Sequence, residues 1–216
     1  MKALTSPVDL DFTAKAPEVP AAPARRSDHD LLEATKNGDE SAFAELVGRY
    51  QNQITNYVYR LLGDYEEAID LAQETFVRVY FAAGRYHTHF AFSTYIYRIA
   101  TNLAISEMRR RKRRKLMSLT GLFQNEDGDS DKEFDIPDEE TLPEEALLDK
   151  ERSNVITRAI ASLPEKYRMP LVLREVEEKS YEEVAEILDL SQGTLKSRLS
   201  RGRGLLREKL KGYFAE

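Results

Sequence analysis

Basic and small polar side chains crowd the last predicted helix of the sequence, SQGTLKSRLSRGRGLLREKL, and give it the chemistry to bind a polyanion. Leu195 and Leu199 lie at helical spacing and would hold one face of this helix against a partner helix. The other faces carry donors that neutralise phosphates or hydrogen-bond to guanine edges. The candidate DNA-binding residues are Ser191, Gln192, Gly193, Thr194, Lys196, Ser197, Arg198, Ser200, Arg201 and Arg203.

A second basic cluster is the unbroken run from Arg109 to Lys115, at the end of another predicted helix. The formal net charge of −6 argues at first against a nucleic-acid partner, but the charges are segregated along the chain. A stretch rich in aspartate and glutamate, from Glu126 to Glu140, separates the two basic clusters. Two basic surfaces with an acidic segment between them indicate a polyanion that is bound at two places. The alternative is that each run is only a solvated charged face.

His87 and His89 form a His-x-His pair of the kind that can ligate zinc. The chain has no cysteine, and His29 is its only other histidine, so the usual ligand set is incomplete. The sequence also contains no phosphate-binding loop and no Ser/His/Asp arrangement. We therefore expect no metal site, no cofactor and no enzymatic activity.

The elements that carry these groups are predicted to be helices, because no strand pattern competes with the helical spacing of the apolar residues. Residues 1–27 hold prolines among alanines and are expected to form a disordered tail. Ser27 or Asp28 would cap a first helix, which is broken near Asn37-Gly38. Further helices are predicted over residues 49–62, 66–81 and 94–115, within a first domain of residues 28–116.

Residues 117–143 contain glycines and many acidic side chains but no sustained apolar period, so they are predicted to be a flexible linker. A second helical domain is expected over residues 144–213. The sequence thus predicts an all-α fold of two helical domains joined by an acidic linker.

The second domain is predicted to end in a helix-turn-helix. Pro164 would end its first helix, and Pro170 should be tolerated only near the first turn of the next, residues 167–176. A short helix over residues 181–188 and a basic helix capped by Ser191 would then flank a tight turn. In this arrangement the second helix can enter the major groove of DNA.

These motifs resemble those of extracytoplasmic-function (ECF) sigma factors of the sigma-70 family, in the family order. The segment SLPEKYRMPLVLREVEEKSYEEVAEILDLSQGTLKSRLSRGRGLL is similar to region 4, which reads the −35 promoter element. GDYEEAIDLAQETFVRVY resembles the region 2 helix that docks on core RNA polymerase, and FSTYIYRIATNLAISEMRRRKRR resembles the helix that reads and melts the −10 element. The resemblance implies an RNA polymerase sigma factor that directs promoter-specific transcription initiation.

The same resemblance implies roles for individual residues. Asp70, Gln73 and Glu74 would bind core polymerase, although an ordinary solvated face is the alternative. Tyr95 either stacks on an unpaired base or belongs to the core, and Tyr97 also offers a ring for stacking. The candidates for the −10 element are Tyr86, His87, His89, Phe92, Tyr95, Arg98, Asn102, Arg109 and Arg110.

Several positions depart from the family pattern, among them Tyr95, which stands where the family usually has tryptophan, and Ile69, which stands where an acid is common. Residues 86–90 read Tyr-His-Thr-His-Phe where the family usually has a Phe-Arg-Gly sequence, so the base preference of this loop does not transfer. Asp189 replaces a turn glycine, and aspartate is among the few residues that tolerate a left-handed conformation. Glu178-Lys179 replaces a usual Gly-Leu.

The partners implied by the resemblance are core RNA polymerase, through the clamp helices of its largest subunit and its flap region, promoter DNA and an anti-sigma factor. A sigma-like decoy and a stand-alone helix-turn-helix regulator are the competing hypotheses. No apolar run approaches the roughly 20 residues of a membrane-spanning helix, and Met1 to Arg26 lacks the apolar core of a signal peptide. We therefore expect a cytoplasmic protein without membrane insertion.

Overall fold

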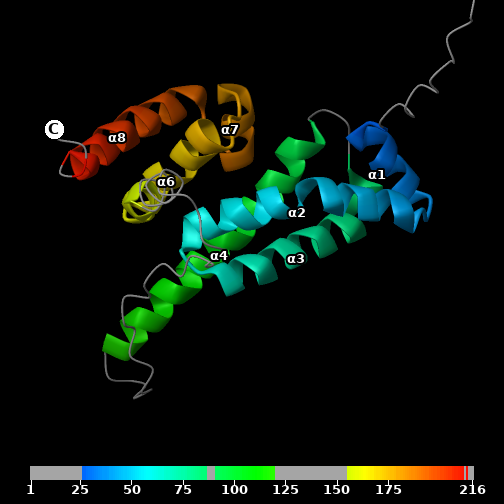
Figure 1. Cartoon of the computed structure of the whole chain (residues 1–216), viewed down its shortest axis with the longest axis horizontal. Helices are drawn as coiled ribbons and strands as arrows, with labels where there is room; N and C mark the ends of the chain where they lie inside the picture. The colour runs from blue at the N-terminus through cyan, green and yellow to red at the C-terminus, as the bar shows by residue number, and fades with distance from the viewer. Residues whose placement is uncertain (1–25, 87–90, 120–154, 212, 214–216) are drawn as a thin grey trace, which may run out of the picture.

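A computed structural model describes residues 26–86, 91–119, 155–211 and 213, and every regular element among them is helical. The all-α fold class is confirmed. Figure 1 shows two groups of helices, with the helices that follow residue 155 stacked beside one end of the N-terminal group.

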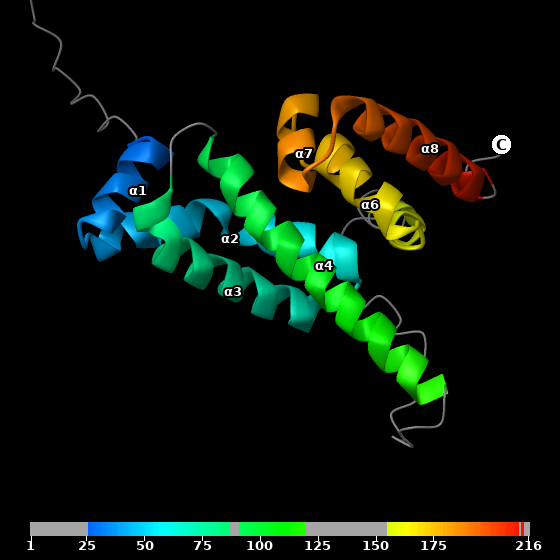
Figure 2. The ribbon, with the colours of Figure 1, turned by 180° about the vertical axis from the view of Figure 1, so that it is seen from behind.

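The N-terminal domain is built on three long helices and two short ones. Its elements are α1 (Asp28–Lys36), α2 (Glu40–Leu62), α3 (Tyr65–Ala82), the short 3-10 helix η1 (Ala83–Arg85) and α4 (Phe92–Leu119). Helices α2 and α3 run side by side, and α4 crosses them and projects past the bundle at its C-terminal end (Figure 2).

Short polar side chains cap the N-termini of α1, α2 and α3. The Ser27 hydroxyl accepts from the Asp30 N–H at 3.1 Å, and the Asp30 carboxylate accepts from the Ser27 N–H at 3.2 Å, which is a capping box. The Asp39 and Asp64 side chains cap α2 and α3 by accepting from the N–H groups of Ala42 and Glu67. The predicted break near Asn37-Gly38 is confirmed, because Gly38 has a φ of 91°, a conformation open to glycine without steric cost.

Helix α2 begins earlier than the sequence predicts. The expected helix of residues 49–62 is the second half of one continuous helix from Glu40, which passes through Gly48 without a break. Ala42 and Leu46 are fully buried in this first half. Their packing outweighs the low helix propensity of Gly48, since tertiary contacts routinely override local propensity.

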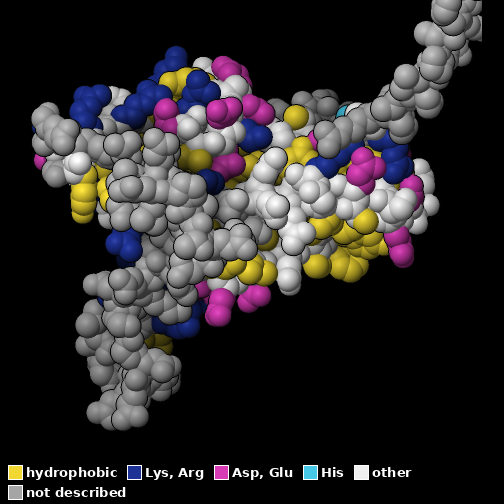
Figure 3. Space-filling model, viewed as in Figure 1, with side chains coloured by type: hydrophobic (Ala, Val, Ile, Leu, Met, Phe, Trp, Pro, Cys, Tyr) yellow, Lys and Arg dark blue, Asp and Glu magenta, His cyan; other side chains and the backbone are white. Residues whose placement is uncertain are grey.

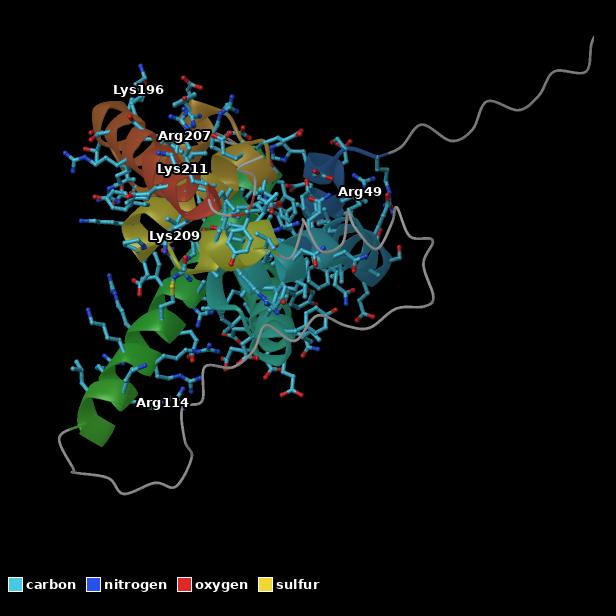
Figure 4. All side chains as sticks on the ribbon, turned by 60° about the vertical axis from the view of Figure 1, so that its left-hand side comes forward. Arg49, Arg114, Lys196, Arg207, Lys209 and Lys211 are labelled. Carbon is cyan, nitrogen blue, oxygen red and sulfur yellow. The ribbon has the colours of Figure 1, made fainter. Side chains whose placement is uncertain are left out.

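A buried aromatic pair joins α2 to α4. The rings of Tyr57 and Tyr97 meet edge to face with centroids 5.1 Å apart, and the Tyr57 hydroxyl is 2.8 Å from the Thr101 hydroxyl. Burial raises the pKa of Tyr57 well above its usual value. At the other end of α2, Arg49 lies between α1 and α2 and donates to Asp28 at 2.6 Å (Figure 4).

The C-terminal domain contains a helical segment at residues 155–161, followed by α6 (Glu165–Leu171), a π-helical turn η2 (Val172–Val176), α7 (Tyr181–Leu188) and α8 (Gln192–Leu210). Its core is formed mainly by leucines and valines, among them Leu171, Leu173 and Val184.

Pro170 does not lie in a first turn, which corrects the sequence-based expectation. Helix α6 starts at Glu165, so Pro170 is its sixth residue and is buried. Proline has no N–H, and the Lys166 carbonyl therefore lacks its usual helical donor. The chain changes to the π-helical turn η2 directly after this point.

Candidate nucleic-acid interface

The helix-turn-helix is formed by α7 and α8. Asp189 ends α7 in a left-handed conformation with a φ of 50°, as the sequence predicts for this turn. Ser191 caps α8 by accepting from the Thr194 N–H at 3.3 Å. Leu195 and Leu199 are 0% and 1% exposed, so they hold α8 against its neighbours as expected.

The first half of α8 presents most of the predicted DNA-binding residues to solvent. Arg198 is half-buried, and the Thr194 hydroxyl lies 2.9 Å from the Ser191 hydroxyl, so Ser191 and Thr194 also serve the helix cap. The exposed candidates are Ser191, Gln192, Gly193, Thr194, Lys196, Ser197, Ser200, Arg201 and Arg203. Figure 3 shows basic side chains gathered over this domain, and Lys196 points away from the rest of the molecule (Figure 4).

Two of the arginines have partners inside the domain. Arg203 donates to Glu175 on η2 with an Nη2–Oε1 distance of 2.6 Å. A hydrogen bond from Arg201 is the main cause that lowers the pKa of Tyr167. Arg201 and Arg203 therefore lie on the side of α8 that faces α6 and η2, whereas Lys196 does not.

Gly202 is a residue that sequence reasoning did not single out. It is buried, and a Cβ at this position would meet the Tyr167 carbonyl oxygen at 3.3 Å and Leu171 Cδ1 at 3.4 Å. Glycine thus allows α8 to approach α6 closely. No local pattern distinguishes Gly202 from Gly204, whose Cβ would meet nothing within 4 Å.

The aromatic candidates before and at the start of α4 belong to the core. Tyr86 and Phe92, both candidates for the −10 element, are 6% and 5% exposed, so their rings are packed in the core in this conformation. Tyr95 is half-buried, and its ring lies 4.8 Å from that of Tyr86. Tyr97 is 1% exposed and donates to Glu177 of the C-terminal domain at 2.5 Å, so its ring is not available for stacking.

Polar candidates further along α4 are accessible. Arg98 and Asn102 are one helical turn apart and both are exposed. Arg98 is ion-paired with Glu186 on α7, with an Nη1–Oε1 distance of 2.6 Å. His87 and His89 lie outside the described residues, and no cluster suited to a metal ion occurs within the part of the chain that the structure describes.

The basic run of α4 contains its own counter-ion. Glu107 is 5% exposed and accepts hydrogen bonds from Arg110, from Arg111 at 3.0 Å and from Arg114 at 3.4 Å. Burial alone would raise the pKa of Glu107, but the guanidinium groups of Arg110 and Arg111 outweigh it and lower that pKa.

Three other cations of the run are accessible to anions. Arg109, Lys112 and Arg113 are exposed and make no ion pair within the described residues. The run therefore contains arginines held by Glu107, at Arg110, Arg111 and Arg114, as well as the exposed Arg109, Lys112 and Arg113. Arg114 marks the end of α4 that projects beyond the bundle (Figure 4).

One exposed face of helix α3 is polar in the middle of the helix and apolar near its C-terminal end. Asp70 and Gln73 are exposed, and Glu74 is partly exposed and pairs with Arg78 at 2.8 Å. Val77 and Phe81, 48% and 81% exposed, follow on the same face. Hydrophobic side chains gather over this end of α3 in Figure 3.

An open groove between α2 and α3 flanks this face and was not anticipated from the sequence. Polar side chains of α2 form one wall, and Gln73 links the groove to the exposed face of α3. The lining residues are Val47, Gln51, Asn52, Thr55, Asn56, Tyr65, Ile69, Ala72, Gln73 and Phe76.

Comparison with known proteins decides the family. The family model described as Sigma-70 region 2 matches residues 46–114, and that described as Sigma-70, region 4 matches residues 153–206. The ECF RNA polymerase sigma factor SigW of Bacillus subtilis is 38% identical over 185 residues, which cover 83% of this chain and 95% of SigW. The chain belongs to the ECF group of the sigma-70 family.

Other relatives agree with this assignment. The RNA polymerase sigma-H factor of Pseudomonas aeruginosa is 35% identical over 89% of this chain and 98% of its own length. The ECF RNA polymerase sigma-E factor of Escherichia coli K12 is 35% identical over 85% of this chain and 94% of its own length. As a sigma factor, the chain is a transcription initiation factor of RNA polymerase and not an enzyme.

Two solved structures share the fold of this sigma factor. CnrH, solved in complex with the cytosolic domain of CnrY, has a TM-score of 0.62 at 20% identity, covering 87% of this chain and 99% of its own. RpoE of Bartonella quintana, solved with the anti-sigma factor NepR, has a TM-score of 0.60 at 22% identity, covering 78% of this chain and 96% of its own. Among the described helices of this sigma factor, none is long and apolar enough to cross a membrane.

Proposed function

We propose that this sigma factor reads the −35 element with the first half of α8, reads the −10 element with α4 and docks on core polymerase through α3. The observation that carries the proposal is the geometry of α8. Buried leucines fix one of its sides, and the opposite side presents exposed donors directly after a tight turn. That arrangement suits insertion into a major groove.

For the −35 element, the small residues Gly193 and Ser197 leave room for the backbone of α8 to approach the groove. Lys196 supplies positive charge on the exposed side, and Arg201 adds an exposed guanidinium at the border with α6. Lysine and arginine contact phosphates and guanine edges, whereas serine and glutamine contact either bases or backbone. Arg203, held by Glu175, would act at the edge of the contact.

For the −10 element, the exposed groups of α4 form a line along the helix from Arg98 through Asn102 to Arg109. The spacing of four and seven residues places them on neighbouring turns of one side. Cations at the far end would hold the phosphates of the melted strand, while Asn102 has the donors and acceptors to contact a base edge. Arg110 contributes less because Glu107 and Glu67 neutralise it.

For core polymerase, the docking surface would combine Asp70, Gln73 and Glu74 with the exposed Val77 and Phe81. Exposed large apolar side chains next to polar ones are typical of protein interfaces. The clamp helices of the largest subunit are the expected partner here, and the flap region is the expected partner of the C-terminal domain. An anti-sigma factor that covers these surfaces and a cytoplasmic location follow from the same proposal.

The experiment that tests the proposal is transcription with purified protein, core RNA polymerase and a genomic fragment library, followed by sequencing of the new RNA start sites. Discrete starts that share two spaced upstream motifs are expected. The variant Arg201→Ala should lose these starts. DNA binding without core binding would favour a stand-alone regulator, and loss of both would favour a decoy.

The docking surface has its own test in the same system. Phe81→Ser should weaken binding to core polymerase severalfold without loss of thermal stability, because Phe81 is exposed. Leu116→Ser is the matched control, since Leu116 is an exposed apolar residue on the projecting end of α4. Equal effects of the two substitutions would contradict the assignment of α3 as the docking helix.

A further inference from the structure

Two exposed arginines of α8, Arg201 and Arg203, are held by partners of opposite kinds. Arg203 is ion-paired with the Glu175 carboxylate at 2.6 Å, so its charge is offset within the domain. Arg201 instead donates a hydrogen bond to the hydroxyl of Tyr167 on α6, and a phenol brings no negative charge of its own. Arg201 is therefore held in direction but keeps its positive charge for another partner.

The close packing of α6 and α8 keeps this pair together. Gly202, the residue after Arg201, is buried, and a Cβ on it would lie 3.3 Å from the Tyr167 carbonyl oxygen and 3.5 Å from Tyr167 Cβ. The backbone of α8 thus lies directly against Tyr167. Figures 1 and 2 both show the two helices side by side. Tyr167 and Arg201 therefore meet at the border between these helices.

A second cation approaches the same phenol from α6. The ammonium group of Lys166, an exposed residue, lies 4.9 Å from the centre of the Tyr167 ring. A hydrogen bond from Arg201 lowers the pKa of Tyr167, and one from Lys166 adds to this effect, because nearby cations favour the phenolate. Neither cation makes an ion pair with a carboxylate within the described residues. Two positive charges therefore converge on one hydroxyl group.

Converging cations around a hydroxyl suit an anion that has several acceptor oxygens. A guanidinium carries more N–H donors than one hydroxyl can use, so Arg201 has donors left for a ligand. The Tyr167 hydroxyl accepts from the cations and still has its own proton to donate. Clustered donors with a net positive charge match the oxygens of a phosphate diester, whereas a guanine edge offers acceptors without a charge. The chemistry of this border thus favours a phosphate over a base.

The place of Arg201 on α8 favours the same ligand. An α-helix is about 10–12 Å across and the major groove of DNA is roughly 12 Å wide, so an inserted helix fills the groove. Side chains on the flank of such a helix meet a sugar–phosphate backbone, and those that point into the groove meet base edges. Arg201 lies on the flank that borders α6, whereas Lys196 points away from the rest of the molecule (Figure 4).

We propose that Lys166, Tyr167 and Arg201 form a site for one backbone phosphate at the edge of the −35 element, with Tyr167 as the residue that positions Arg201. This inference rests on the proposed role of α8 and narrows it, because it assigns Arg201 to the backbone and not to a base. It also adds two residues of α6 to the DNA contacts. The phosphate site sets the register of α8 in the groove, since phosphate contacts position a protein on the duplex.

The test uses holoenzyme, reconstituted from the full chain and core polymerase, on a promoter duplex from the transcription experiment. Phosphates around the −35 element are replaced one at a time by uncharged methylphosphonates, and the dissociation constant is measured for each duplex. Replacement at one position should weaken binding of wild type about tenfold. The same replacement should have little further effect on Arg201→Ala, because that variant has already lost the contact. Arg207→Ala, at an exposed arginine further along α8, is the matched control and should remain as sensitive as wild type.

The positioning role has its own variant. Tyr167→Phe keeps the ring but removes the hydroxyl that holds Arg201. On the unmodified duplex it should bind about threefold more weakly than wild type, and its sensitivity at the identified phosphate should fall. Lys166→Ala should lose sensitivity at the same phosphate. Tyr213→Phe is the matched control, since Tyr213 is an exposed tyrosine beyond the end of α8. Thermal unfolding midpoints equal to that of wild type would show that the fold is retained.

Several results would overturn the phosphate site. Equal sensitivity of wild type and Arg201→Ala at every phosphate would show that Arg201 does not contact the backbone. A relaxed preference of Arg201→Ala at one base pair of the −35 element would assign this arginine to a base instead. Tyr167→Phe behaving like Tyr213→Phe on every duplex would remove the positioning role. Holoenzyme that does not prefer the mapped −35 element over a scrambled sequence would contradict the role of α8 itself, and the phosphate site with it.

Discussion

Glu107 accepts a hydrogen bond from Arg111 at 3.0 Å, beneath a surface that is otherwise dominated by positive charge. The same arginine reaches Asp64, the N-terminal cap of α3, at 3.2 Å. Arg111 therefore ties the basic segment of α4 to the start of α3. At Arg111 the basic segment stabilises the packing of α4 on α3, whereas at Arg109, Lys112 and Arg113 it presents cations to solvent.

The first prediction concerns the stability of this connection. Glu107→Gln should destabilise the fold by about 1–3 kcal/mol, because hydrogen bonds to charged groups contribute that much and three arginines lose their shared counter-ion. Urea denaturation measures the change. Glu66→Gln, at an exposed position of α3, is the control and should have little effect. Equal stability of the two variants would show that Glu107 is not needed as a counter-ion.

A second prediction concerns pH. The pKa of Glu107 is lowered from its usual value of 4.5, so the unfolded chain binds this proton more readily than the folded one. The stabilisation by ionised Glu107 is present above pH 4.5 and is lost as the pH falls through the lower folded-state pKa. Unfolding midpoints measured from pH 6 to about pH 3 should fall less steeply for Glu107→Gln than for wild type.

The third prediction compares two glycines of α8. Gly204→Ala should stabilise the protein by about 0.5–1 kcal/mol, because alanine is the better residue in a helix and Gly204 has open space around it. At Gly202 the added methyl group presses on the Tyr167 carbonyl, so the gain should be smaller or reversed. The thermal unfolding midpoints of the two variants, compared with wild type, measure these changes in stability. Equal gains would contradict the close approach of α6 and α8.

A fourth prediction separates the two halves of α8. Lys196→Ala should weaken binding to a duplex with the mapped −35 element and lower the slope of log K against log salt by about one, as for a lost phosphate contact. Lys209→Ala removes the same charge near the other end of the helix (Figure 4). An equal loss of slope in both variants would indicate general electrostatic attraction instead of a docked first half.

The fifth prediction concerns the strained turn at Glu178. Glu178→Gly should stabilise the fold by about 0.5–1 kcal/mol, because glycine adopts a positive φ freely, although it also gains freedom in the unfolded chain. Asp189→Gly should gain less, because aspartate tolerates the same conformation better than glutamate. Chemical denaturation of both variants provides the comparison, and the reverse order would contradict it.

Local signals allowed much of this fold to be predicted. Ser191 and Ser27 are short polar residues before apolar spacing, and both cap helices. Asn37-Gly38 ends α1, and Asp189 forms the left-handed turn of the helix-turn-helix. Each of these features depends on residues within a few positions of each other, which is why spacing and residue type were sufficient.

Features set by distant contacts were not predictable in this way. The sequence presents Tyr86 and Phe92 as candidates for the −10 element, without showing that they pack with His29 and Tyr50 from earlier helices. Glu177 meets Arg60 across 117 positions of sequence, and no periodicity connects them. The sequence also shows seven adjacent cations in α4, but it does not reveal that the buried Glu107 pairs with three of them.

The exposed cations at Arg109, Lys112 and Arg113 contact no other part of the described chain through ion pairs, and they stand on a helix end that projects past the bundle (Figure 2). Substitutions at these three positions therefore leave the hydrophobic core untouched. Under the role proposed for α4, mutation here would raise or lower the strength of promoter melting in small steps while the fold stays intact. The projecting end of α4 is thus a place where related promoters and their sigma factor can diverge together at little risk to folding.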